Sequence, residues 1–181
     1  MFDDNDIKIA GNRPSDSINK NNLSVVYEDV MSEAITLSAK KLGEYVADRF
    51  SEASDAYYDA VEDADANMFV QRILLLSFTV TAVFESSITN DAVAGIAQKS
   101  FLDAVRTKYK DIYKYTSDTG AFTFYYLAYR RGSEIERRMG QTFAMLCAHD
   151  GDPIYQELGE VLFCWFSSVV KDAIEQHNLL N

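Results

Sequence analysis

Apolar residues recur every three to five residues along most of this chain, and almost nothing that breaks a helix interrupts them. From Leu23 to Ala64 the apolar positions stay close to the 3.6-residue period of one helix face, with only Gly43 and no proline between them. One very long helix or two collinear ones would fit this segment, with Ser51 or Ser54 as a cap for the second. A strand would require apolar residues at every second position, so the pattern favours helices.

The segment from Met68 to Ile88 is apolar on nearly all sides. Its β-branched residues would also suit a strand, but it exceeds the usual strand length and contains no turn signal. We therefore expect a central helix that other elements contact on several sides.

Residues that are typical of helix ends mark three further helices. Asn90 is a good N-cap for the first, and an aromatic-rich helix begins at about Phe122. Gly132 interrupts that helix, and the pair Ser133 and Glu136 has the spacing of a capping box. The sequence Asp152-Pro153 predicts the start of a final helix that runs to about His177.

We therefore predict an all-α protein, an irregular or antiparallel bundle of five to seven helices, with no sheet of three or more strands. Residues 1–22 hold too few apolar side chains to offset their ordering and are interpreted as a flexible or loosely docked tail. Residues 23–181 are expected to form a single helical domain.

The last helix carries an apolar stripe that should face the core. The stripe comprises Ile154, Leu158, Val161, Leu162, Trp165, Val169 and Ile174. We expect Trp165 to be buried, with Phe69 or Phe78 among its neighbours.

The net charge of −11 makes direct binding of nucleic acid unfavourable, because that binding depends on lysine and arginine neutralising phosphates. The acidity is concentrated in residues 1–66, which carry 15 acids and 6 bases, whereas residues 67–181 carry 13 and 11. The acidic N-terminus differs from an export signal, and Cys147 and Cys164 form no C-x-x-C pair, so we expect a cytoplasmic protein with reduced thiols. The apolar stretch 73–84 is shorter than the ~20 residues of a membrane span, so no membrane association is expected.

The sequence lacks the residue patterns that are usual for metal binding and for nucleophilic catalysis. Leu146 and Ile174 stand three residues before His149 and His177, so the Glu-x-x-His pairs of a di-iron bundle are missing from the sequence. The Asp-rich segment at Asp63 lacks the glycine and glutamate of a calcium loop. We expect neither a metal nor another cofactor, and a catalytic role is the third of our hypotheses.

Acidic residues form one row along the predicted first helix at spacings of 4, 4, 3, 4 and 3 residues: Glu44, Asp48, Glu52, Asp55, Asp59 and Glu62. We call this row the acidic ridge. Like charges at these spacings destabilise a helix by roughly 0.2–0.5 kcal/mol per pair, so local stability does not explain the ridge. It could be a solvated face, or it could pair with a basic row at helical spacing: Lys99, Arg106, Lys110 and Lys114. Alternatively, it is an exposed docking surface for a basic protein, and a row of carboxylates can imitate a phosphate backbone.

A second candidate site combines aromatic and basic side chains in the segment 122–138. Tyrosines with polar tips can line a pocket for a flat ligand, and arginine forks suit phosphate or carboxylate groups. The candidate ligand-binding residues are Tyr125, Tyr129, Arg130, Arg131, Arg137 and Arg138. The competing interpretations are a core edge with hydroxyls in water for the tyrosines, and pairing with Glu134 and Glu136 for the arginines.

Our leading hypothesis is a non-enzymatic protein-interaction module, such as an inhibitor, an antitoxin-like protein or an adaptor. It would bind a basic partner, for example a nucleic-acid-binding protein, through the acidic ridge. The alternative is a ligand-responsive helical domain that binds a small anionic or aromatic molecule.

Overall fold

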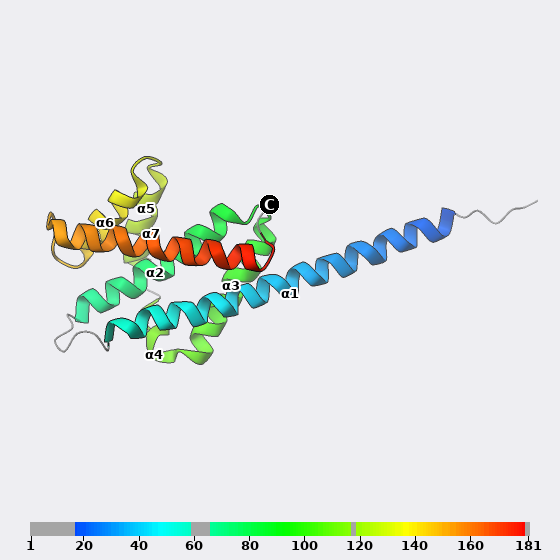
Figure 1. The fold of residues 1–181 in the computed structure, drawn as a ribbon, viewed down its shortest axis with the longest axis horizontal. Coiled ribbons are helices and arrows are strands. Elements are labelled where there is room, and N and C mark those ends of the chain that lie inside the picture. The colour runs from blue at the N-terminus through cyan, green and yellow to red at the C-terminus, as the bar shows by residue number, and fades with distance from the viewer. Residues whose placement is uncertain (1–16, 59–65, 117–118, 180–181) are drawn as a thin grey trace, which may run out of the picture. The chain divides into compact units, whose positions relative to one another are not determined.

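The computed structural model describes the backbone of residues 17–58, 66–116 and 119–179, and the side chains of residues 32–54, 66–116 and 120–179. These residues form seven helices and no strand, which confirms the all-α prediction (Figure 1). The helices are α1 (Ser17–Tyr58), α2 (Ala66–Ser87), α3 (Asp91–Lys108), α4 (Lys110–Tyr113), α5 (Thr119–Arg130), α6 (Ile135–Leu146) and α7 (Pro153–Gln176).

The chain divides into two units, residues 1–34 and residues 35–181. The described part of the first unit is the beginning of α1, which starts at Ser17 rather than at the expected Leu23. No glycine or proline lies between Ser17 and Leu42, so a helix can extend over these polar residues. Residues 1–16 of the expected tail lie outside the described residues.

The second unit holds the remainder of α1 and all of α2 to α7. Residues 35–58 of α1 form one continuous helix, so Ser51 and Ser54 do not cap a second one. Both side chains are buried, and the Ser54 hydroxyl donates to the carbonyl oxygen of Phe50 at 2.8 Å. The segment 59–65 lies outside the described residues.

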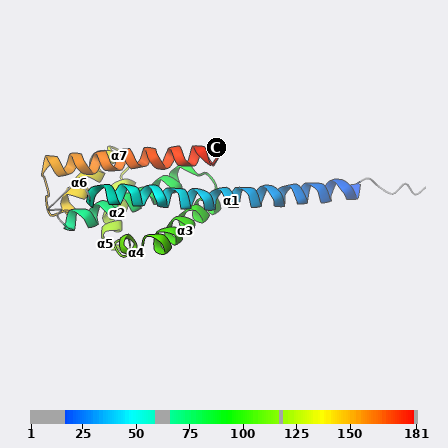
Figure 2. The same ribbon diagram turned by 60° about the horizontal axis from the view of Figure 1, so that its bottom comes forward.

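One hydrophobic core lies between α1, α2, α3 and α7 (Figure 2). Phe50 stands at its centre, with ring centroids 5.4 Å from Phe101 and 6.4 Å from Phe166. A second core lies between α2, α5, α6 and α7, where the Phe78 ring contacts Phe122, Tyr125 and Tyr129.

Helix α2 contributes to both cores, as expected for a helix that is apolar on nearly all sides. Ile73, Leu76 and Val80 face the first core, whereas Leu74 and Phe78 face the second. By length and composition alone α2 could span a membrane, but 72% of its most apolar window is buried within the protein. This burial is typical of the central helix of a helical bundle.

Glycines allow two pairs of helices to approach very closely. A Cβ atom at Gly43 of α1 would collide with the carbonyl oxygen of Ala97 and lie 2.7 Å from the Phe101 nitrogen in α3. Gly140 of α6 and Gly159 of α7 meet in the same way, because a Cβ atom at Gly159 would lie 2.6 Å from the Cβ of Phe143. These contacts fix α1 against α3 and α6 against α7.

The expected caps of α3 and α7 are confirmed. The Asn90 side chain accepts hydrogen bonds from the backbone nitrogens of Ala92 and Val93, and the Asp152 carboxylate accepts one from Ile154 at 2.8 Å. Gly151 has the left-handed conformation that precedes this cap (φ +80°).

The prediction of a capping box at Ser133 is wrong. Helix α6 begins at Ile135, with Glu134 in the capping position at φ +50°, so Ser133 lies one residue too early. The Arg138 guanidinium instead donates to both the carbonyl and the hydroxyl oxygens of Ser133. Gly132 does interrupt the helical structure between α5 and α6, as predicted, with φ +77°.

The prediction that Trp165 lies in the core is wrong. Trp165 is 45% exposed, and Ile154 and Val161 of the same predicted stripe are 73% and 57% exposed. Leu162 and Ile174 of that stripe are buried as predicted, and the rest of the buried face of α7 is formed by Gly159, Phe163, Phe166, Val170 and Ala173. The helix is apolar on two faces, and the face with Gly159 is the one that can approach α6 closely enough to pack.

Candidate functional site

The described part of the acidic ridge lies on the outer face of α1. Glu44 and Glu52 are exposed, whereas Leu42, Val46 and Phe50 of the same helix are fully buried. The rigid contacts of the buried face therefore hold these two carboxylates at the surface. The side chain of Asp55, together with Asp59 and Glu62, lies outside the described residues.

Asp48 differs from its neighbours because it binds α3. Its Oδ1 atom accepts hydrogen bonds from the Lys108 Nζ at 3.1 Å and from the Tyr109 hydroxyl at 2.9 Å. The hydrogen bond from Lys108 raises the pKa of that lysine. Partial burial, followed by the hydrogen bond to Asp48, raises the pKa of Tyr109. The middle of the described ridge is thus partly neutralised.

The basic row considered as a partner for the ridge is engaged differently. Arg106 pairs with Asp103 at 3.0 Å, and Lys114 lies over the Tyr115 ring at 4.7 Å. Lys99 lines a groove of about 610 Å³ between α1 and α3, which also contains Glu44 and Lys40. Glu52 pairs with Arg49 within α1 at 2.9 Å, an exposed pair that leaves the carboxylate in solvent.

Tyr125 was predicted to contact a ligand, but it is fully buried in the second core. Its hydroxyl has no hydrogen-bond partner among the described residues, and burial raises its pKa well above the ordinary value. It therefore belongs to the core and does not reach either surface groove described below.

Tyr129 and Arg130 line a groove of about 500 Å³ between α2 and α5. Phe78 and Phe122 form its apolar floor, and Tyr126 contributes to its wall. Arg130 donates to the Tyr126 hydroxyl at 3.3 Å, and its guanidinium carbon lies 5.5 Å from the centre of that ring. This cation is held above an aromatic surface and still faces solvent.

The other three arginines lie elsewhere. Arg131 and Arg138 line a smaller groove of about 270 Å³ with Asp150 and Gln156. Arg137 is exposed and lies 3.5 Å from Glu134. The predicted ligand-binding set is thus divided between the core, two grooves and the open surface.

The described residues include no group of three or more His, Cys, Asp or Glu side chains that could hold a metal ion. His149 stacks on Tyr155 with ring centroids 3.7 Å apart, and Cys147 is buried. Cys164 is exposed, but desolvation and the nearby carboxylates of Glu136 and Glu160 raise its pKa. A raised pKa disfavours the thiolate that nucleophilic catalysis would require.

Sequence reasoning missed the second wall of the α2–α5 groove and the α3 side of the Asp48 contact. Thr81 and Glu85 of α2 line the groove although they are about 40 residues from Tyr126 in the chain. Likewise, Lys108 is the last residue of α3 and Tyr109 caps that helix, whereas Asp48 lies in α1. Spacing along one helix carries no signal for such contacts.

Comparison with protein-family models, with curated proteins and with solved structures finds no match for this chain. The function is therefore inferred from the geometry of the protein itself.

Proposed function

We propose that this protein is a non-enzymatic interaction module that binds a basic partner through the outer face of α1. The observation that supports this proposal is the exposure of Glu44 and Glu52 on a helix whose opposite face is fully buried. A docking surface of this kind is preorganised, so binding does not require the helix to become ordered.

The charge of the whole chain supports the same proposal. With a net charge of −11, the protein repels phosphate backbones and attracts basic surfaces from a distance. Residues four apart on a helix are separated by about 6 Å along its axis, so Glu44, Asp48 and Glu52 place their carboxylates at regular intervals along α1. A nucleic-acid-binding protein is the basic partner that such a row suits best.

The experiment compares two charge-reversed baits for affinity capture from a cell lysate. The test variant is Glu44→Lys with Glu52→Lys, and the control is Asp111→Lys with Glu175→Lys, which alters two exposed acids outside α1 and changes net charge equally. Asp48 is left intact because its reversal would also disturb α3.

The wild type and the control should retain the same basic proteins and release them as salt increases, whereas the ridge variant should lose them. Equal capture by both variants would contradict the proposal. Retention that is insensitive to salt would contradict it too, because contacts between exposed charges are screened.

A second candidate function is the binding of a small aromatic anion between α2 and α5. The groove has a volume of about 500 Å³, which lies in the usual range for small-molecule sites. It combines aromatic side chains with the guanidinium of Arg130. In a thermal-shift assay, an aromatic carboxylate that binds this groove should raise the melting temperature of the wild type and of the Arg137→Ala variant. It should not raise the melting temperature of Arg130→Ala.

A further inference from the structure

Helix α7 carries a second apolar face that the fold leaves largely uncovered. Ile154, Val161 and Trp165 are 73%, 57% and 45% exposed, whereas Leu158 between them is half-buried against the second core. These four residues form the α7 stripe. A helix of a monomeric protein normally turns charged or polar side chains to solvent on this side, so the stripe is typical of an interaction surface.

The spacing of the stripe is that of a seam between two helices. Its members follow one another at intervals of 4, 3 and 4 residues, and continuing the same alternation leads to Ser168 and Asp172. Apolar residues at alternating intervals of three and four residues form the contact line of paired helices. The contact is expected to be strongest at Val161 and Trp165, in the middle of α7.

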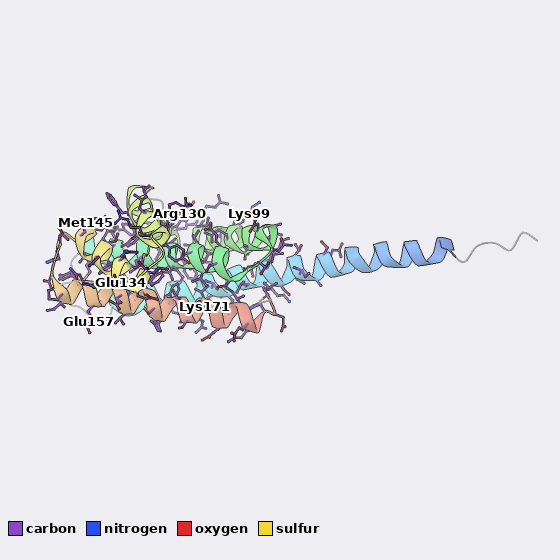
Figure 3. All side chains as sticks on the ribbon, turned by 90° about the horizontal axis from the view of Figure 1, so that it is seen from above. Lys99, Arg130, Glu134, Met145, Glu157 and Lys171 are labelled. Carbon is purple, nitrogen blue, oxygen red and sulfur yellow. The ribbon has the colours of Figure 1, made fainter. Side chains whose placement is uncertain are left out.

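Charges along one edge of the stripe indicate what covers it. Glu157, Cys164 and Lys171 are exposed and follow one another at seven-residue intervals, so they lie on one line along the helix. Figure 3 shows Glu157 and Lys171 on α7. Neither forms an ion pair with any side chain that the structure describes.

When a second copy of this line runs in the opposite direction, its charges are complementary to those of the first. If a two-fold axis passes at the level of Cys164, residues at equal distances before and after it face each other. Glu157 of one copy then faces Lys171 of the second copy, and the same pair repeats on the other side of the axis. With the same axis, Val161 lies three residues before it and Trp165 one residue after it, so both apolar side chains lie in the centre of the contact.

We propose that two copies of this chain pair through α7 in antiparallel orientation, with Cys164 at the two-fold axis. A parallel arrangement would place Glu157 against Glu157 and Lys171 against Lys171, which is unfavourable. The acidic face of α1 contributes no residue to this surface, so this proposal and the proposed function can fail independently.

The size of the stripe limits the expected affinity, and so does the repulsion between the carboxylates of Glu136 and Glu160 that a two-fold axis at Cys164 brings together. The first and last of the four residues are 11 residues apart, or about 17 Å along the helix, which is less than a standard protein interface provides. We therefore expect a reversible dimer with a dissociation constant in the micromolar range, where small interfaces lie.

Sedimentation equilibrium of the full chain from ~1 to ~200 µM measures this association across the range expected for a micromolar dimer. The wild type should pass from monomer to dimer, whereas Val161→Lys should remain monomeric. Leu127→Lys is the matched control, because Leu127 is 53% exposed on α5 and should not contribute. A wild type that stays monomeric over this range would overturn the proposal, as would a dimer that Leu127→Lys dissociates and Val161→Lys does not.

Charge exchange tests the antiparallel orientation. Glu157→Lys and Lys171→Glu should each weaken the dimer by about 5-fold or more, because each creates two pairs of like charge. The double variant Glu157→Lys with Lys171→Glu should restore the wild-type affinity. Absence of this recovery would overturn the arrangement, since a parallel dimer or a different partner would give no reason for it.

Two intrinsic probes report on the same contact. The chain has one tryptophan, so emission should shift to longer wavelength on dilution as Trp165 becomes fully hydrated. A short bismaleimide linker should join two chains through Cys164 at about pH 8.5, near the ordinary pKa of cysteine, and Cys164→Ser should abolish the product. Cross-linking that is equally efficient in Val161→Lys would overturn the proposed position of Cys164.

Discussion

At the residue scale, Asp48 joins α1 to α3 by accepting hydrogen bonds from both Lys108 and Tyr109. A carboxylate in the acidic ridge thus contributes to the fold as well as to the surface charge. The carboxylate and the ammonium are each nearly half exposed, so the ion pair itself is worth little, and the hydrogen bond to Tyr109 matters more.

We predict that Asp48→Asn lowers the free energy of unfolding by about 0.5–1 kcal/mol. Glu44→Gln should change it by less than ~0.5 kcal/mol, because that carboxylate is exposed. Urea unfolding at neutral pH measures both values. Equal effects of the two substitutions would show that the contact with α3 is unimportant.

The raised pKa of Tyr109 predicts a dependence of stability on pH. Because the folded state holds the phenolic proton more tightly than the unfolded chain, this contribution is fully present below pH ~10 and is lost as pH rises through the folded pKa. Between pH ~9.5 and ~11 the wild type should therefore lose more stability than Tyr109→Phe. Parallel slopes in denaturation at these pH values would contradict the prediction.

Ala148 ends α6 in a conformation that suits glycine. Its φ is +63°. The backbone nitrogen of Ala148 donates to the carbonyl oxygen of Met145, and that of His149 donates to the carbonyl oxygen of Ala144, which is the hydrogen-bond pattern of a Schellman motif. We predict that Ala148→Gly raises the free energy of unfolding by about 0.5–1 kcal/mol, since a Cβ atom disfavours left-handed backbone. Asn178→Ala should lower it, because Asn178 occupies the equivalent position after α7 (φ +54°). Thermal unfolding of both variants measures the two opposite shifts.

At the element scale, α7 decides how the two cores are joined. It contributes Phe166 to the first core and Phe163 to the second, while the α7 stripe faces outward. The helix is apolar on two sides, and its orientation is set by the elements that it contacts.

Neighbouring aromatic residues of α7 should therefore respond very differently to truncation. Phe166→Ala should cost about 3–5 kcal/mol of folding free energy, because Phe166 is fully buried. Trp165→Ala should cost less than ~1 kcal/mol when measured at a concentration where the chain is monomeric. Chemical denaturation at a protein concentration well below the dissociation constant of the dimer makes the comparison, and a reversed order would contradict the assigned face.

The close packing of helices at glycines leads to a second prediction at this scale. Gly140→Ala should be strongly destabilising, by more than ~2 kcal/mol, because the new methyl group would collide with the carbonyl oxygen of Gln156. Gly95→Ala in α3 should instead stabilise by about 0.5–1 kcal/mol, since its Cβ would meet open space and glycine is a poor helix former. Melting temperatures of the two variants should move in opposite directions.

At the scale of the whole molecule, the net charge of −11 makes mutual repulsion a general cost to folding. We predict that raising sodium chloride from ~20 to ~500 mM increases the melting temperature, because the Debye length falls below the spacing of most surface charges. Adding EDTA at constant ionic strength should not change it, since the described residues include no candidate metal cluster. A melting temperature that falls with salt, or that EDTA lowers, would contradict this account.

The sequence by itself determined the helices and most of their ends. Periodicity near 3.6 residues is a local property of the chain, and so are the caps at Asn90 and Asp152, because each depends on residues within one turn. The same local reasoning placed Glu44, Asp48 and Glu52 on one helix and identified α2 as central. It failed at Ser133, where one residue of shift in the helix start removed the capping geometry.

Only the tertiary structure decided which faces meet. It turned Phe166 inward and Trp165 outward, placed Tyr125 in the core and Tyr126 in a groove, and gave Asp48 its partners on α3. The physical reason is that burial depends on the shape and distance of elements far apart in the chain. Where a helix is apolar on two sides, its hydropathy pattern does not select one of them, and close approach of a neighbouring helix at glycines such as Gly159 makes the selection.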